Sequence, residues 1–159
     1  ELIRQTLACP QAAPALGAPC AKRVDALAIA PYFGGYLGTA ELQPLVSSWP
    51  READGVDRVF QELLGEDAQG RAAKPPLQGR HAQAPEGGAL AQSRGWMRSA
   101  KALADAQGLP LLAYEGGQHL TPPPGKEDDP AWLSLIASAN RDSRMGETLE
   151  NISEGVKRH

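Results

Sequence analysis

The chain has 159 residues, 42% of them hydrophobic, which is enough for one domain with a packed core. Its 19 acidic residues outnumber its 16 basic ones, and no basic stripe is present, so the composition argues against a nucleic-acid-binding protein. No run of about 18 apolar residues occurs, which excludes a predicted transmembrane helix. The sequence opens on Glu1 without a signal-peptide pattern, and we expect an internal segment of a longer chain.

The predicted elements begin with a short helix over residues 1–8 and a loop over residues 10–19. An apolar run over residues 24–30, ended by a proline, predicts a buried strand of a parallel sheet. Residues 57–64 follow as a helix with one apolar face. Residues 65–88 are polar and rich in Gly, Pro, Gln and Ala, which indicates a long mobile loop.

The second half of the chain repeats this alternation. The predicted elements are a helix over 89–106, a buried strand over 109–114, a helix that starts at Asp129-Pro130, and a last helix over 144–156. This order indicates an α/β architecture with parallel strands joined by crossovers. Two strands cannot close a barrel, so residues 1–159 are expected to form a single partial domain that pairs with something outside itself.

Cys9 and Cys20 are the two cysteines of the sequence. They could form a disulfide that closes the proline-rich loop, which would indicate an oxidising compartment. Two cysteines alone do not fix a connectivity, and we favour separate thiols. Neither cysteine has the close-spaced partners of a zinc site, so no metal or cofactor is expected.

Glu115 is the best candidate for a catalytic carboxylate. It follows the second predicted strand, and in barrel enzymes catalytic groups collect at the carboxyl ends of the strands. Gly116 and Gly117 free the backbone to turn, and Tyr114, Gln118 and His119 add hydrogen-bonding groups. From these residues alone, a plain turn with a solvated glutamate is the favoured interpretation, because a single Glu-Gly-Gly is a weak motif.

Three ordered segments carry a resemblance to a known family. Residues 111–120 (LLAYEGGQHL), 24–35 (VDALAIAPYFGG) and 139–146 (ANRDSRMG) resemble two neighbouring barrel strands and a following helix of bacterial glycoside-hydrolase-like proteins. These proteins are similar to the large clan of retaining (β/α)8 enzymes with two catalytic glutamates. The resemblance implies a partial (β/α)8 TIM barrel, roughly strands six and seven with their helices.

The resemblance also implies roles for individual residues. Glu115 would be the nucleophile of a parent enzyme that hydrolyses β-linked carbohydrate, and Tyr32 would be the aromatic residue that orients it. The general acid/base belongs to a fourth strand that has no match here, so we expect the isolated chain to be inactive. The implied partners are a carbohydrate and the remainder of the barrel, with neither nucleic acid nor membrane, in an extracellular or periplasmic location.

Further expectations concern the site. Tyr32 and Glu115 should lie at the same end of parallel neighbouring strands, with the phenol within hydrogen-bonding reach of the carboxylate or one water away. Tyr114, Gln118 and His119 are candidate sugar-binding residues. Trp49 is the preferred sugar-stacking platform, whereas a second tryptophan at position 96 is expected in the core or an interface. The alternatives are a carbohydrate-binding or structural module without catalysis, and an unrelated small α/β interaction domain.

Overall fold

The computed structural model describes residues 2–157. The helices are α1 (Leu2–Ala8), α2 (Ala13–Leu16), α3 (Gln43–Val46), α4 (Gly55–Leu64), α5 (Gly88–Asp105), α6 (Pro130–Arg141) and α7 (Ser143–Lys157). The strands are β1 (Leu27–Ile29), β2 (Tyr32–Phe33), β3 (Leu111–Ala113) and β4 (Gly117–Gln118), and three short 3-10 helices are η1 (Cys20–Arg23), η2 (Gly35–Gly38) and η3 (Trp49–Arg51). No helix in the described part of the chain is both long and apolar enough to cross a membrane.

The strands form a narrow parallel ribbon. β1 pairs with β3 and β2 pairs with β4, both in parallel, which confirms the predicted pairing of neighbouring parallel strands. The fold is therefore mixed α/β with small parallel sheets. The strands are shorter than predicted, and they are not fully buried, because Ala28 and Leu112 on one face are exposed.

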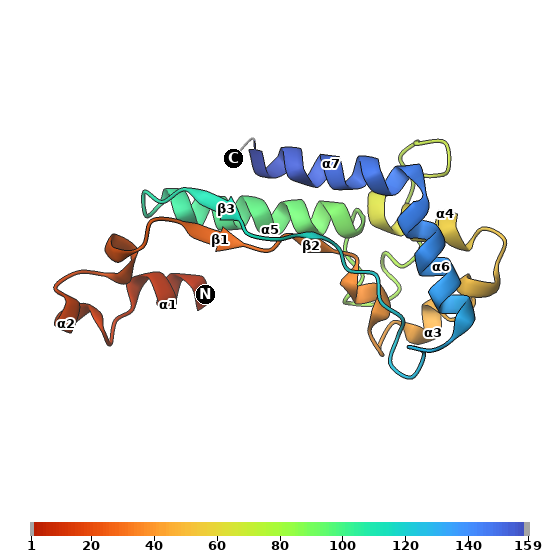
Figure 1. Cartoon of the computed structure of the whole chain (residues 1–159), viewed down its shortest axis with the longest axis horizontal. Coiled ribbons are helices and arrows are strands. Elements are labelled where there is room, and N and C mark those ends of the chain that lie inside the picture. Colours follow the sequence, from red (N-terminus) through yellow and green to blue (C-terminus); the bar gives the residue numbers. More distant parts are fainter. Residues whose placement is uncertain (1, 158–159) are drawn as a thin grey trace.

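Helix α5 covers the other face of the ribbon. Figure 1 shows it running along the length of both strand pairs, with α7 beside it. Its buried positions include Leu90, Met97, Ala100 and Ala104, which recur at helical spacing and face the strands. The helix therefore provides the connection between β2 and β3 that the alternating sequence pattern predicts.

The larger core lies at the end of the ribbon where α3, α4 and α6 gather (Figure 1). Phe60 and Leu63 of α4 meet Trp132 and Leu135 of α6 there, all nearly or fully buried. The start of α6 follows the predicted pattern, because Asp129 accepts a hydrogen bond of 3.0 Å from the backbone N–H of Ala131.

The long loop between α4 and α5 has no helix or strand, as predicted, apart from one isolated bridge between Glu66 and Ala72. It is nevertheless held against the core. The Leu77 side chain is fully buried, and its backbone N–H donates to Glu62 Oε2 at 2.9 Å. The expectation of a mobile loop did not anticipate this anchor in the middle of the segment.

The N-terminal elements form a second, smaller packing unit. Cys9 and Cys20 are joined by a disulfide with a Cα–Cα distance of 5.7 Å, so the preference for separate thiols is wrong. Helix α1 and η1 pack against the end of α5 through Leu7, Ala21 and Ala104. After α1 the chain reverses direction near α2, and this reversal brings the two cysteines together. The linear sequence does not reveal the reversal.

Candidate functional site

A bulge in the ribbon positions Glu115. Between the paired segments, two residues, Ala30 and Pro31, lie on one strand, whereas three residues, 114–116, lie on the other. The backbone stays paired on both sides, since Tyr114 N–H donates to Ile29 O at 3.1 Å. The extra residue redirects the chain locally, as bulges commonly do beside functional sites, and leaves the Glu115 side chain exposed.

The two glycines after Glu115 have separate structural reasons. A Cβ at Gly116 would lie 3.0 Å from Pro31 Cγ and 3.2 Å from Pro31 O, closer than ordinary van der Waals contact, so Pro31 would have to shift. Gly117 has φ of +132°, a region that L residues rarely adopt. The backbone of the bulge therefore accounts for the two glycines, independently of any catalytic role of Glu115.

Tyr32 and Glu115 lie together at the bulge, beyond the carboxyl ends of β1 and β3, as expected. Partial loss of solvent raises the pKa of the Tyr32 phenol above its usual value, and the charge of Glu115 and a hydrogen bond to its carboxylate raise this pKa further. The neutral phenol is thus the form that the neighbouring carboxylate favours. A neutral phenol at this position can donate to the Glu115 carboxylate and so orient it.

His119 completes a group of three side chains. Its ring lies edge-on to Tyr32, with centroids 5.5 Å apart and an interplanar angle of 77°. Its backbone N–H donates to Phe33 O at 2.8 Å, which continues the ribbon pairing beyond β4. The parallel pairing thus presents Tyr32 from one strand and His119 from the other on the same side.

A pocket of about 430 Å³ adjoins Tyr32 and His119. Its lining residues with polar side-chain atoms are Tyr32, Tyr36, Gln83, Gln92, Trp96 and His119. Sequence reasoning missed Gln83 and Gln92, because one lies in the segment interpreted as a mobile loop and the other on a helix interpreted as structural. Gln92 and Trp96 are four residues apart on α5, a spacing that indicates a shared face and could have drawn attention to them.

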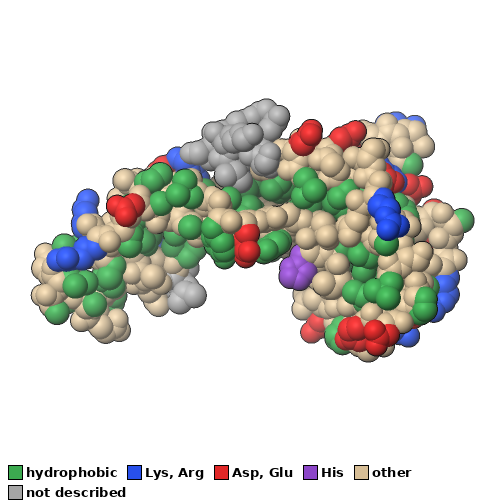
Figure 2. Space-filling model, in the orientation of Figure 1, with side chains coloured by type: hydrophobic (Ala, Val, Ile, Leu, Met, Phe, Trp, Pro, Cys, Tyr) green, Lys and Arg blue, Asp and Glu red, His purple; other side chains and the backbone are tan. Residues whose placement is uncertain are grey.

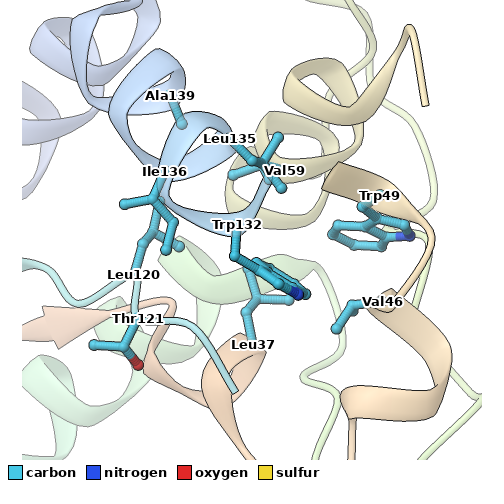
Figure 3. A pocket seen from close by; sticks show the side chains of 10 residues that line it. All are labelled: Leu37, Val46, Trp49, Val59, Leu120, Thr121, Trp132, Leu135, Ile136 and Ala139. Carbon is cyan, nitrogen blue, oxygen red and sulfur yellow. The ribbon is translucent and has the colours of Figure 1, made fainter. Parts of the chain in front are cut away.

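Of the two candidate tryptophans, Trp49 is buried and Trp96 is exposed. Trp49 is only 3% exposed and packs beside Val46 and Trp132 around a cavity of about 10 Å³ (Figure 3), so it cannot stack on a sugar. The interpretation of Trp49 as a platform is wrong. Trp96 is 60% exposed, so it does not lie in the core, whereas its expected place in an interface stays a prediction.

The remaining predicted residues flank the pocket. Gln118 uses its Oε1 to accept a hydrogen bond of 2.6 Å from the Leu120 backbone N–H, which stabilises the turn after β4. Tyr114 is 68% exposed and lines a neighbouring groove rather than the pocket. Both lie near Glu115 in the chain, but only Tyr114 leaves its hydrogen-bonding side chain open to solvent.

Glu62 is a buried carboxylate that sequence reasoning did not single out. Tyr36 Oη donates to Glu62 Oε1 at 2.6 Å, and Leu77 N–H donates to Oε2 at 2.9 Å. Burial raises the pKa of Glu62, although these two hydrogen bonds oppose the rise. Burial also raises the pKa of Tyr36, and the Glu62 charge and hydrogen bond add to that rise. The signal in the sequence was its place beside Leu63 on the apolar face of α4.

Within the part of the chain that the structure describes, no group of three or more His, Cys, Asp or Glu side chains is arranged to hold a metal ion. Several acidic side chains instead pair with arginines and lysines or cap helices, as in Asp142 with Arg144.

Comparison with family models, with curated proteins and with solved structures finds no match to this chain.

Proposed function

We propose that this chain is part of a longer, glycoside-hydrolase-like parent protein. The parent hydrolyses β-linked carbohydrate with retention and uses Glu115 as the nucleophile. The observation that carries the proposal is the exposed Glu115 on the bulge after β3, close enough to Tyr32 for its charge to raise the pKa of the phenol. The resemblance of the surrounding segments to barrel strands six and seven supports the same assignment. The proposal includes the partial barrel formed by this chain and the carbohydrate substrate of the parent.

In this mechanism, the Glu115 carboxylate attacks the anomeric carbon and the bond to the leaving oxygen breaks. A phenol that donates to one carboxylate oxygen fixes the orientation of the other, which is the role proposed for Tyr32. The leaving oxygen takes its proton from a second carboxyl group, which the parent supplies outside the segments that resemble this chain. Water then releases the sugar from Glu115.

The pocket that adjoins Tyr32 and His119 would supply the contacts for the sugar. The exposed indole of Trp96 offers an aromatic face, and an amphipathic ring of this kind suits the apolar face of a pyranose. The amides of Gln83 and Gln92 and the imidazole of His119 can donate to and accept from hydroxyl groups. An extracellular or periplasmic location is part of the proposal, and the disulfide supports it because such bonds persist in oxidising compartments.

The second candidate function is carbohydrate binding without catalysis. It is favoured by one specific observation: the aromatic and amide groups of the pocket need no second carboxylate to hold a glycan. Under this alternative, Glu115 accepts hydrogen bonds from sugar hydroxyls and does not attack.

Assays of the chain and of Glu115→Gln on aryl β-glycosides with good leaving groups separate the two functions, because such leaving groups need little protonation. We expect negligible turnover from the chain alone, since general acid assistance is worth roughly 10²–10⁴-fold and substrate contacts are also missing. Addition of the remaining barrel strands should restore turnover in the native chain and not in Glu115→Gln. Glu41→Gln, an exposed glutamate elsewhere, is the matched control.

Binding is measured separately by NMR titration with a panel of β-linked oligosaccharides. Both functions predict shifts of the Trp96 indole and His119 resonances, and Trp96→Ala should abolish the shift of His119. Restored turnover that is equal in Glu115→Gln would remove Glu115 from the mechanism. An absence of shifts across the panel would remove carbohydrate binding altogether.

A further inference from the structure

The pocket of about 430 Å³ beside Tyr32 and His119 has no acidic residue, lysine or arginine among the described residues that line it. Its hydrogen-bonding side chains carry two phenols, two amides, an indole and an imidazole. On the face drawn in Figure 2, hydrophobic, acidic and histidine side chains border the hollow between the two ends of the molecule, and no lysine or arginine of the described residues borders it there. The groups that line the pocket are thus those that pair with hydroxyl groups rather than with an anion.

Two carboxylates lie next to lining residues of this pocket. Glu62 is 0% exposed and accepts a hydrogen bond of 2.6 Å from Tyr36 Oη. Glu115 lies beside Tyr32, where partial burial and then the charge of Glu115 raise the pKa of the phenol. The lining residues supply no lysine or arginine that would offset these two negative charges. An anionic ligand in the pocket would therefore meet repulsion from both carboxylates.

The two carboxylates also determine what the phenols offer to a ligand. A phenol has one hydrogen to donate, and Tyr36 donates it to Glu62, while Tyr32 can donate it to Glu115. Toward a ligand, each phenol oxygen then acts as an acceptor. A sugar hydroxyl can donate to such an oxygen, whereas an ionised carboxylate has no hydrogen to donate. The hydrogen-bonding arrangement and the charge thus favour the same kind of ligand.

We propose that this pocket holds a neutral sugar unit and discriminates against an acidic one, such as a uronate. The inference rests on the proposed carbohydrate function of the site and names the class of sugar that it accepts. The amides of Gln83 and Gln92 each supply donors and an acceptor, which match a ring that carries several hydroxyl groups. Proteins that bind a carboxylate commonly use the paired donors of an arginine, and the lining of this pocket provides none.

The test compares three probes that differ only at C6 of the sugar: methyl β-glucoside, methyl β-glucuronide and the methyl ester of that glucuronide. NMR titration at about pH 8, where imidazole groups carry no charge, follows the Trp96 and His119 resonances. We expect the glucoside and the neutral ester to bind within about twofold of each other, and the glucuronide to bind about tenfold more weakly. Salt at about 1 M should reduce this difference, because ions screen the repulsion. The comparison leaves the protein unchanged.

Protein variants give a second, independent comparison. Gln92→Arg places a guanidinium on the pocket wall and should lower the preference for the glucoside over the glucuronide about tenfold. Gln107→Arg makes the same change at an exposed residue beyond the end of α5, outside the pocket, and should leave the preference unchanged. Glu115→Gln removes a neighbouring negative charge and should also lower the preference. Circular dichroism checks that the variants fold, and if Gln92→Arg does not, the three probes alone decide.

Equal or tighter binding of the glucuronide would overturn this inference and leave carbohydrate binding standing. Weak binding of both the glucuronide and its ester would also overturn it, because size at C6 rather than charge would then be the cause. The same holds if Gln107→Arg changes the preference as much as Gln92→Arg. No shift with any of the three probes would overturn the inference too, and if the panel of β-linked oligosaccharides also gives none, the proposed function fails with it.

Discussion

Glu62 shows how one residue connects a pocket wall to a distant loop. Its carboxylate is 0% exposed, and it receives hydrogen bonds from Tyr36, which lines the candidate site, and from Leu77 in the middle of the long loop. Two neutral donors replace only part of the water that an ionised carboxylate loses on burial. The result is a raised pKa for Glu62, with burial as the dominant cause.

The raised pKa predicts a pH dependence of stability. An acid whose pKa is higher in the folded protein favours folding while protonated, so stability is fully present below the unfolded pKa, near 4.5, and falls as pH rises toward the folded value. Glu62→Gln cannot ionise, and its amide can accept from Leu77 N–H and donate to Tyr36 Oη. We therefore expect Glu62→Gln to gain stability relative to the native chain as pH rises.

Urea unfolding at roughly pH 4 and pH 7 measures this difference. Glu147→Gln, an exposed glutamate on α7, is the control and should show a smaller pH-dependent difference. Glu62→Ala should lose about 1–3 kcal/mol at either pH, because two buried donors lose their acceptor. A constant difference between Glu62→Gln and the native chain would contradict the raised pKa.

At the scale of elements, the bulge between β3 and β4 is the feature that positions Glu115. Gly116→Ala would press a methyl group against Pro31, where both the ring and the backbone oxygen lie within 3.2 Å. We expect a loss of about 1–3 kcal/mol in the free energy of unfolding, in the range of overpacking elsewhere. The Tyr32 and His119 resonances should shift as well, because the bulge aligns the two strands.

Gly146→Ala in α7 provides the matched control, since nothing lies within 4 Å of the position that the added methyl group would occupy and the residue is helical. This substitution should stabilise by up to about 1 kcal/mol through helix propensity. Equal effects of the two substitutions in thermal unfolding would show that the contact with Pro31 is not restrictive.

The long elements were predictable because their burial repeats along the sequence. The helix expected over 57–64 spans Gly55–Leu64, and the one expected over 89–106 spans Gly88–Asp105. The register step at the bulge was not predictable, since it depends on which residue faces Pro31 across the pair. Short helices such as α2 and α3 have too few residues to show a period.

The candidate site was predictable only where strand ends define it. Tyr32, Glu115 and His119 follow from the rule that parallel strands bring their carboxyl ends to one edge. The burial of Trp49 and the exposure of Trp96 were not predictable, because polar or charged residues flank both in the sequence and only tertiary packing decides which indole the core covers. Gln83 reaches the pocket through the anchored loop, for which no local pattern exists.

At the scale of the whole molecule, two separate hydrophobic clusters hold the chain. The larger one joins α4, α6, α7 and the long loop, whereas the smaller one joins α1 and η1 to the end of α5 and β3. The smaller cluster has four well-buried members, including Leu7 and Leu109. Residues 2–23 are therefore expected to open before the rest of the fold.

The disulfide should control that opening. Cys9 and Cys20 are separated by 11 positions in the sequence, and a cross-link that closes a loop of this order contributes about 3 kcal/mol by restricting the open chain. Replacement of both cysteines by serine should therefore make the amides of α1 exchange much faster, while those of α4 and α6 keep their protection. Hydrogen exchange followed by mass spectrometry resolves the two regions, and reductant added to the double variant, which should change nothing, is the control. If protection were lost in α4 and α6 to the same extent as in α1, the two clusters would unfold as one unit and the disulfide would stabilise the whole molecule rather than its N-terminal part.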